Sequence, residues 1–574
     1  MAESALTDRD LASAQEARRL AQRAKQAAPH LAELTQEQID RIVDAMAAAV
    51  RPEVESLARL AVEETGFGLV ADKIQKNAFA ADRVHAFIRP MKTVGVVRRD
   101  EEKKLVEIAE PFGVVAAIVP STNPTSTAIY KILIALKARC PIVISPHPSA
   151  ARCITRVAEI MAAAATAAGA PAGSINWMTT VSLEGTQELM KHRDVAVILA
   201  TGGMGLVRAA YSAGKPAYGV GPGNAPCYIE QSADLEKAAL DIITGKSFDN
   251  GVLCSSPNSV VVDRAVADEV RRQFVKHGAH FLSPAEAEKL TGALVTPQRL
   301  PNPKFVGKTA AFIAGQIGIT VPAGTRVLIA ELEGVGREFP LSIEKLCPVL
   351  SYYVVADWRE GCERCIQILR YGGMGHTMSI HSQNDDVILQ FGLKKPAFRI
   401  VVNTPTTHGS IGLTTGLDPA MTLGCGGWGG NITSDNISPR HLLNIKRLAY
   451  ELQPAARAAA APKFPSAAAA PSAARPVDLP RAPGAPAPLG IDAGAMSRQV
   501  ESLLGGAAKT TTGSLAAADD RTTAVDFVCE EDVRQALRLA RKIVIGDRTI
   551  ITPAAREMGE ANRVFVMAYW PRGS

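Results

Sequence analysis

From about residue 107 onward, short apolar runs alternate with stretches of helical periodicity, and this alternation limits the possible folds most. Residues 113–119 form a continuous apolar run, which is typical of a strand buried on both faces. Further strands are expected at 142–145, 175–178 and 195–200, and helices at 125–138, 150–168 and 206–213. Such a series of βαβ units predicts an α/β fold with a doubly wound sheet and right-handed crossovers.

Ligands of doubly wound sheets bind beyond the carboxyl ends of the strands. This rule points to residues 120–123, 145–147 and 201–205. The last segment, Thr201-Gly-Gly-Met-Gly205, would present bare N–H groups to a phosphate at the start of a helix. It lacks the full G-x-G-x-x-G spacing, so a glycine turn that only closes a loop remains an equal alternative.

Cys254 lies in a segment rich in turn-forming residues, Ser247-Phe-Asp-Asn-Gly-Val-Leu-Cys254, just before a β-rich run at 259–262. This places the thiol on a loop at the mouth of a strand, whereas core cysteines usually lie inside apolar periodic segments. From these residues alone, a nucleophile and a packed thiol are equally open. The glycine-rich segment 219–226 lies upstream, would allow close approach of backbone to a ligand or to another strand, and contains no Asp, Glu or His.

The composition narrows the class of protein. A chain of 574 residues predicts two or three domains, and its 63 basic and 57 acidic residues are mixed along the chain. With 5% aromatic residues and no basic stripe, nucleic-acid binding is not expected. No signal peptide begins the sequence, and no run reaches the ~20 apolar residues of a membrane span. Nine cysteines indicate a reducing, cytoplasmic setting without a disulfide framework.

No metal site is expected either. The pair Cys362 and Cys365 forms a lone CxxC in a helix-like segment. Two core thiols that share the spacing by coincidence are the favoured interpretation over a metal or redox site. Amphipathic helices explain residues 10–90, where Thr35 and Gln38 have the spacing of a capping box.

Several motifs occur in the order and spacing of the aldehyde dehydrogenase superfamily. They are Val62-Glu-Glu-Thr-Gly66, Ile118-Val-Pro-Ser-Thr-Asn-Pro-Thr-Ser-Thr-Ala-Ile129, Ser145-Pro-His-Pro148, Ile198-Leu-Ala-Thr-Gly-Gly203, Ser247-Phe-Asp-Asn-Gly251, Glu344-Lys-Leu346, Gly375-His-Thr377 and Thr422-Leu-Gly-Cys-Gly-Gly-Trp-Gly-Gly-Asn431. Over residues 10–452 the sequence resembles the CoA-acylating branch, in particular the acetaldehyde dehydrogenase half of bifunctional aldehyde–alcohol dehydrogenases. The iron-dependent alcohol dehydrogenase half is absent, so only the aldehyde/acyl-CoA step is expected.

The resemblance implies an aldehyde dehydrogenase fold and assigns catalytic roles. The Cys254 thiolate would add to the aldehyde and give a thiohemiacetal, whose oxyanion the Asn123 amide and the Cys254 N–H would bind. Without the resemblance, Asn123 is better explained as a turn residue before Pro124. His376 resembles a histidine near the acylating active site, which could orient the acceptor thiol or assist its deprotonation.

The resemblance also implies NAD and coenzyme A as cofactor and cosubstrate. The expected cofactor-binding residues are Pro120, Ser121, Ser145, His147, Thr201, Gly202, Gly203, Gly221 and Glu344. Glu344 corresponds to the glutamate that holds the nicotinamide ribose, although by its sequence alone it is better explained as a solvated loop acid. Ser145 stands where hydrolytic relatives carry a lysine, which leaves the choice between NAD and NADP open.

The absence of a carboxylate at one position predicts which molecule accepts the acyl group. Hydrolytic relatives activate water with a glutamate, and the equivalent place here is Val220 or Gly219, neither of which can accept a proton. We therefore expect acyl-CoA formation from acetaldehyde or propionaldehyde. The alternatives are an acylating sulfoacetaldehyde dehydrogenase, a hydrolytic aldehyde dehydrogenase and a non-catalytic scaffold. Cys425, which also lies in a glycine-rich loop, is the one serious rival nucleophile.

The C-terminal part differs in composition. An Ala/Pro-rich linker is followed by a short amphipathic helix with apolar residues at helical spacing, which resembles the encapsulation peptides of microcompartment enzymes. An ordinary tethered tail is the alternative. The expected domains are 1–247 (N-terminal helices and NAD-binding domain), 248–430 (catalytic domain), 431–452 (return to the NAD-binding domain and oligomerisation), 453–490 (linker), 491–505 (encapsulation helix) and 524–570 (small α/β module).

The expected small-molecule partners are a short aldehyde and CoA. The chain is also expected to form a homodimer or a homotetramer and to bind a shell protein through residues 491–505. The oligomer would assemble through β arms around 92–110 and 432–452. The expected location is the cytoplasm, with the lumen of a bacterial microcompartment as the alternative.

Overall fold

The computed structural model describes residues 8–453, 525, 527–546 and 549–567. It divides into two compact units, Met1–Pro462 and Lys463–Ser574. The first unit begins with the helices α1 (Arg9–Ala32), α2 (Gln36–Val50), α3 (Val54–Thr65), α4 (Val70–Ala78) and α5 (His85–Ile88). The predicted capping box is present at the start of α2, where the Thr35 hydroxyl accepts from the Gln38 N–H.

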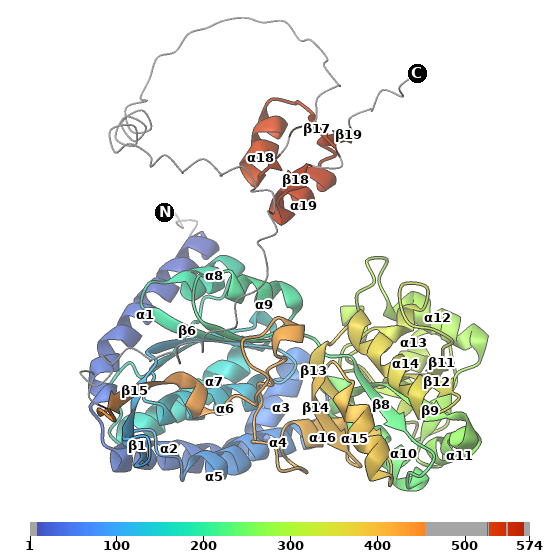
Figure 1. The fold of residues 1–574 in the computed structure, drawn as a ribbon, viewed down its shortest axis with the longest axis horizontal. Coiled ribbons are helices and arrows are strands. Elements are labelled where there is room, and N and C mark those ends of the chain that lie inside the picture. Colours follow the sequence, from blue (N-terminus) through green and yellow to red (C-terminus); the bar gives the residue numbers. More distant parts are fainter. Residues whose placement is uncertain (1–7, 454–524, 526, 547–548, 568–574) are drawn as a thin grey trace, which may run out of the picture. The chain divides into compact units, whose positions relative to one another are not determined.

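A five-stranded parallel sheet organises the first lobe of this unit (Figure 1). Its strands are β3 (Val114–Val119), β4 (Ile142–Pro146), β5 (Ile175–Trp177), β6 (Val195–Thr201) and β7 (Ala217–Val220), in the order β5-β4-β3-β6-β7. The order reverses direction at β3, where doubly wound sheets bind their ligands. Helices α6 (Pro124–Lys137), α7 (Ala151–Ala167), α8 (Leu183–Lys191) and α9 (Met204–Tyr211) connect the strands.

Both faces of this sheet are covered, as the continuous apolar strands predict. Val115 and Val119 of β3 pack in a core with α2, α6 and α7. Val114 and Ile118 of the same strand belong to a second core with α1 and α8 on the other face. Alternate residues of one strand thus serve two helical layers, because successive side chains point to opposite faces.

A seven-stranded parallel sheet forms the second lobe, in the order β10-β11-β12-β9-β8-β13-β14. Its strands are β8 (Ala225–Ile229), β9 (Pro257–Asp263), β10 (Ala279–Phe281), β11 (Val327–Glu331), β12 (Val349–Val355), β13 (Gly375–His381) and β14 (Ala397–Val402). The helices of this lobe are α10 (Leu235–Ser247), α11 (Ala267–Lys276), α12 (Pro284–Leu294), α13 (Ala310–Gln316), α14 (Trp358–Tyr371), α15 (Asp385–Leu393) and α16 (Thr406–Ser410).

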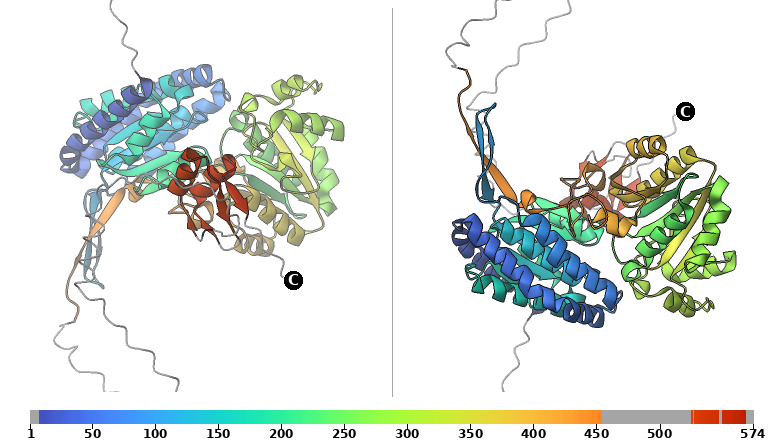
Figure 2. Two further views of the ribbon diagram at one scale, coloured as in Figure 1. Left: turned by 90° about the horizontal axis from the view of Figure 1, so that it is seen from above. Right: turned by 90° about the horizontal axis from the view of Figure 1, so that it is seen from below.

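A three-stranded antiparallel sheet joins residues that are far apart in sequence. β1 (Gly95–Asp100) pairs with β2 (Leu105–Pro111), and β2 pairs with β15 (Leu443–Ala449). Figure 2 shows these strands projecting from the rest of the unit as an arm. β15 is exposed along nearly all of its length and lies at the edge of its sheet, so its outer backbone groups have no partner strand within the described chain.

The second unit contains two short parallel pairs, β16 (Phe527–Val528) with β18 (Ile550–Ile551) and β17 (Ile543–Ile545) with β19 (Phe565–Met567). Helices α18 (Glu530–Arg538) and α19 (Pro553–Ala561) accompany them. These elements lie within the small α/β module expected at 524–570. The amphipathic helix expected at 491–505, and all but the first residue of the linker expected at 453–490, lie outside the described residues.

Within the described part of the chain, none of the helices combines the length and the apolar character needed to cross a lipid bilayer.

Candidate active site

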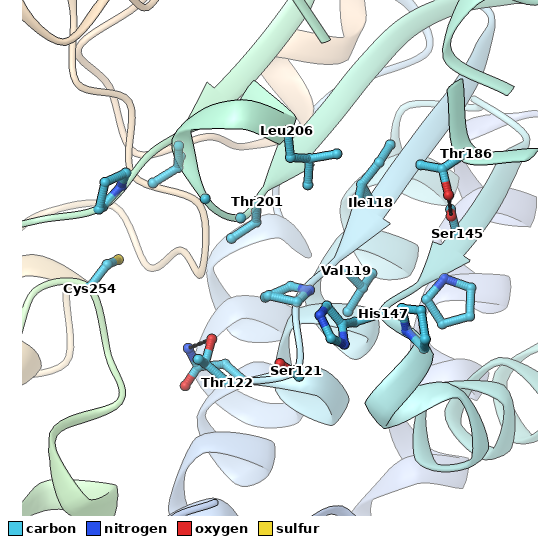
Figure 3. A pocket seen from close by; sticks show the side chains of 18 of the residues that line it. Ile118, Val119, Ser121, Thr122, Ser145, His147, Thr186, Thr201, Leu206 and Cys254 are labelled. Carbon is cyan, nitrogen blue, oxygen red and sulfur yellow. Dashed lines mark hydrogen bonds between the residues drawn. The ribbon is translucent and has the colours of Figure 1, made fainter. Parts of the chain in front are cut away.

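A cavity of about 480 Å³ lies at the carboxyl ends of the five-stranded sheet and extends to the Cys254 loop. It is lined by eleven of the twelve site residues expected from the sequence, namely Pro120, Ser121, Asn123, Ser145, His147, Thr201, Gly202, Gly203, Gly221, Cys254 and Glu344. Figure 3 shows Cys254 on one side of the cavity, facing the ends of the sheet strands across it. The fold thus brings together residues from four strand ends and from two loops, those of Cys254 and Glu344, and only His376 of the expected residues lies outside the lining.

The sheet side of the cavity is suited to a dinucleotide. Gly203 is the N-terminal cap residue of α9, and a Cβ placed on it would meet no atom within 4 Å, so this turn leaves room for a ligand at the start of the helix. The buried Thr201 hydroxyl has no hydrogen-bond partner among the described residues. Further along, the Ser145 and Thr186 hydroxyls are 2.8 Å apart (Figure 3). Room for a ligand at a helix N-terminus and an unpartnered hydroxyl beside it fit the phosphates and ribose of a nicotinamide cofactor.

The Cys254 loop follows a strained turn. Asp249 and Asn250 both have positive φ (49° and 53°), a conformation that Asn and Asp adopt more readily than most residues. Phe248, Val252 and Leu253 pack together beneath the loop, while Cys254 itself stays partly exposed at the cavity wall. Burial, followed by the neighbouring Glu344 carboxyl, raises the pKa of the Cys254 thiol to about 12.

The glycine-rich segment lines the cavity through Gly221 and also approaches the nucleophile loop. A Cβ added to Gly223 would lie 2.0 Å from the Cys254 carbonyl oxygen. The Gly223 N–H donates to Glu344 Oε1 at 2.9 Å. Burial raises the pKa of Glu344 to about 8, although the Gly223 N–H and the Lys246 ammonium oppose this. Glu344 is therefore a half-buried cavity residue that accepts a backbone hydrogen bond, and the interpretation as a solvated loop acid is wrong.

Asn123 caps the N-terminus of α6 and lines the cavity together with Cys254. Its Oδ1 accepts a hydrogen bond from Lys76 Nζ at 2.6 Å, and its Nδ2 donates to Thr122 Oγ1 at 3.2 Å. Sequence reasoning missed Lys76 because α4 looked like a packing helix. The signal was present, since a lysine in a stretch that must be buried needs polar partners.

His376 lies behind the cavity wall in β13. Its ring is fully buried, a Cβ added to Gly223 would be 3.4 Å from its Cγ, and its Nδ1 is 2.9 Å from the Thr377 hydroxyl. Its Nε2 has no hydrogen-bond partner among the described residues. Burial, with a smaller contribution from Arg399, lowers the pKa of His376 to about 3, so the ring is neutral at physiological pH.

The cavity lining contains one carboxylate, that of Glu344. Val220, the expected position of a water-activating glutamate, lines the cavity and is 3% exposed. Gly219 places its N–H 3.0 Å from the Tyr211 hydroxyl and has no side chain to offer. Neither candidate position can therefore activate a water molecule.

The rival thiols are buried. Cys425 is 3% exposed and does not line the cavity, and burial raises the pKa of its thiol to about 11. Cys362 and Cys365 both belong to the core formed with α14, as expected for packed thiols. Of the cysteines that the structure describes, Cys254 is the one that reaches the cavity.

Comparisons with known proteins agree with this geometry. Residues 2–305 match the model of the aldehyde dehydrogenase family. The chain is 42% identical over 435 residues to the bifunctional aldehyde-alcohol dehydrogenase of Escherichia coli, covering 75% of this chain and 49% of that enzyme, so it spans about half the length of this relative. It is 40% identical to the acetylating succinate-semialdehyde dehydrogenase of Clostridium kluyveri, covering 75% of this chain and 95% of the relative.

A solved structure, the acetylating aldehyde dehydrogenase of Geobacillus thermoglucosidasius, superposes with a TM-score of 0.77 at 50% identity, covering 78% of this chain and 99% of that one. The likeness thus extends over nearly the whole of that protein. The chain therefore belongs to the aldehyde dehydrogenase family.

Proposed function

We propose that this protein is a CoA-acylating aldehyde dehydrogenase that converts a short aldehyde, CoA and NAD to an acyl-CoA and NADH. The observation that carries the proposal is the joint placement of Cys254 and Asn123 in one cavity whose wall has Val220 where a water-activating carboxylate would be needed. The names of two relatives, both described as acetylating, support the same reaction type.

In the first step, one residue of the chain acts as the nucleophile and another donates a hydrogen bond to the oxyanion. The Cys254 thiol loses its proton and its sulfur adds to the aldehyde carbonyl, which leaves a thiohemiacetal alkoxide. Asn123 Nδ2 and the Cys254 N–H are the donors for this oxygen, and one such donor contributes about 10²–10³ in rate. A nicotinamide cofactor held in this cavity would supply the hydride acceptor. Gly203, Thr201 and Glu344 are the residues that would hold it.

The same cavity explains why the thioester would pass to a thiol. A thiol ionises near pH 8.5, far below water, and needs less help from a base. Because the pKa of His376 is lowered to about 3, this ring is a poor proton acceptor. We assign it instead an orienting role, in which its unpartnered Nε2 accepts a hydrogen bond from a group that reaches the acyl-enzyme.

The lining also bears on the choice of cofactor and substrate. It includes neither lysine nor arginine, and the phosphate that distinguishes NADP usually pairs with such a cation. This favours NAD. A sulfonate or carboxylate on the substrate would need a cation in the same way, so we assign an uncharged aldehyde such as acetaldehyde or propionaldehyde rather than sulfoacetaldehyde.

One assay tests the reaction. Purified protein supplied with acetaldehyde or propionaldehyde and NAD should form NADH only when CoA is present. Equal NADH formation without CoA would show a hydrolytic enzyme. No NADH with or without CoA, together with a thiol reagent that fails to prefer Cys254, would indicate a non-catalytic scaffold.

We further propose that the arm of β1, β2 and β15 assembles the chain into a dimer or tetramer, because β15 offers an exposed edge with apolar side chains such as Leu448. Light scattering of the wild-type protein and of a Leu448→Lys variant tests this. For residues 491–505 we propose binding to a microcompartment shell. A fluorescent protein fused to residues 454–574 should concentrate in cells that make shells, and diffuse fluorescence would contradict targeting.

A further inference from the structure

A buried cluster of charges connects helix α4 to both halves of the candidate site. Lys73 and Lys76 of α4 are 1% and 2% exposed, and both ammonium groups contact Oδ2 of the fully buried Asp249, that of Lys73 at 2.9 Å. Buried charges are costly unless they are paired and hydrogen-bonded. Packing alone therefore does not explain why such a cluster lies beside the site.

Lys76 fixes the orientation of the Asn123 amide. Its Nζ lies 2.6 Å from Asn123 Oδ1. A lysine ammonium has donors only, so the oxygen of the amide must face it and the NH₂ group must point the other way. The NH₂ group has two hydrogens, and the Thr122 hydroxyl at 3.2 Å takes one. The other is left for a ligand in the cavity that Asn123 lines.

Asp249 ties the nucleophile loop to the same helix. Its Oδ1 accepts from the Leu69 N–H at 2.7 Å, just before α4, and its own N–H donates to Asp72 Oδ2 at 2.7 Å. These bonds hold the positive-φ turn that precedes Cys254. One helical segment thus anchors both the amide and the loop that carries the thiol.

We propose that Lys76 is a positioning residue of the reaction, which orients and polarises the Asn123 amide toward the oxyanion that forms at Cys254. This rests on the proposed function in taking that oxyanion as the group that Asn123 binds. A cation at Oδ1 draws electron density from the amide and strengthens its N–H as a donor, and low local polarity increases the effect. Burial lowers the pKa of Lys76 to about 8, while Asp249 supports its charged form.

The experiment is a double-mutant cycle between Lys76→Met and Asn123→Ala. The readout is the rate at which Cys254 is acylated by p-nitrophenyl acetate, with release of p-nitrophenolate, because this step forms an oxyanion and needs neither NAD nor CoA. We expect K76M alone to slow acylation by roughly 10-fold to 100-fold, a share of what an oxyanion donor supplies. In the N123A background we expect K76M to slow it less than about threefold, because the amide through which it acts is gone.

The matched control is Lys137→Met. Lys137 is also a buried lysine paired with a carboxylate, that of Asp40, and it donates to the Arg89 carbonyl at 2.9 Å, but neither of these partners lines the cavity, whereas Asn123 does. We expect K137M to lower thermal stability and to leave the acylation rate within about twofold. If K76M does not fold, Lys76→Gln replaces it in the cycle, since glutamine removes the charge and keeps a donor.

Two outcomes would overturn the proposal. One is a K76M effect that multiplies fully with that of N123A, because the lysine would then act independently of the amide. The other is a K76M variant that acylates at the parental rate. Failure of the proposed function would give a different result. The wild-type protein would then form no acyl-CoA from aldehydes, while the double-mutant cycle on Cys254 acylation would still show whether Lys76 acts through Asn123.

Discussion

At the scale of single residues, the surroundings of Cys254 favour the thiol over the thiolate. Burial raises its pKa to about 12, and the Glu344 carboxyl adds to the effect, whereas Arg399 acts in the opposite direction. A nucleophile that stays protonated is protected from oxidation and alkylation, because the thiolate is the reactive form. Binding of a positively charged group beside the sulfur would reverse this balance.

Alkylation of Cys254 should therefore respond steeply to pH. Below its pKa, the thiolate fraction of a group grows about tenfold for each pH unit. We expect the rate of iodoacetamide modification of the Cys254 peptide, followed by mass spectrometry, to keep rising between pH 7 and 10. A short synthetic cysteine peptide serves as the control and should level off near pH 8.5–9. Levelling of the Cys254 rate in the same range would contradict the raised pKa.

Replacement of the sulfur tests its role as nucleophile. We expect Cys254→Ser to lower aldehyde oxidation by at least about 10³-fold, since a serine hydroxyl without an adjacent base is a weak nucleophile. Circular dichroism should remain unchanged, because Ser is close to Cys in size. The buried thiol of Cys425 provides the control, and C425A should keep activity within about threefold. Parental activity in C254S would show that the sulfur is not the nucleophile.

The missing carboxylate can be restored. A glutamate at Val220 would reach the cavity that this side chain lines. We expect Val220→Glu to raise the CoA-independent formation of NADH by at least about tenfold, since a positioned general base contributes typically 10²–10⁴. V220Q has the same shape without a proton acceptor and should show no increase. Equal rates in the two variants would mean that the acceptor is chosen by something other than this base.

At the scale of elements, the sequence predicted the strands and helices that carry the site better than the contacts between them. The apolar run at 113–119 contains no polar interruption, and it forms β3 over Val114–Val119 because a strand covered on both faces admits none. The rule that ligands bind at strand ends then places Ser145 and Thr201 in one cavity. Here local pattern and topology together were sufficient.

The contacts that escaped prediction join segments with no shared periodicity. Nothing in the pattern around Gly223 indicates that its backbone lies against the Cys254 carbonyl. The motif around His376 placed this histidine near the site but could not tell on which side of the Gly223 backbone it lies. In the same way, the helical pattern of α4 did not show that Lys76 turns inward to Asn123. Such contacts are set by tertiary packing.

The segment just before β8 contains Gly223 and lies against the nucleophile loop. This contact gives a prediction at the scale of elements. A methyl group at Gly223 would lie 2.0 Å from the Cys254 carbonyl oxygen, so the two segments must separate. We expect Gly223→Ala to lower kcat at least about tenfold, because displacement of a reacting group by 1 Å can cost 10²-fold. Steady-state kinetics and thermal unfolding measure the effect. G292A is the control, since a Cβ on Gly292 of α12 meets no atom within 4 Å. Unchanged kcat in G223A would show that the loop can yield without disturbing the thiol.

At the scale of the whole molecule, the residues that line the candidate site all belong to the first of the two units. Every residue that lines the cavity lies between Ile118 and Leu346, inside the first unit. That unit has its own cores on both faces of each lobe. The change in composition beyond residue 453 predicts the division from sequence, because an Ala/Pro-rich stretch cannot bury enough apolar surface to form a core.

This separation predicts that a chain ending at residue 453 keeps its catalysis. We expect kcat and the KM values for aldehyde, NAD and CoA to stay within about twofold of the full chain, since a domain with its own core folds independently. The control is an equimolar mixture of the truncated chain with a protein comprising residues 454–574, which should add nothing to the rate. A loss of more than tenfold that the mixture restores would mean that the C-terminal unit completes the site. Because the described cavity draws all of its wall from the first unit, we expect the truncated enzyme to differ from the full chain in location alone.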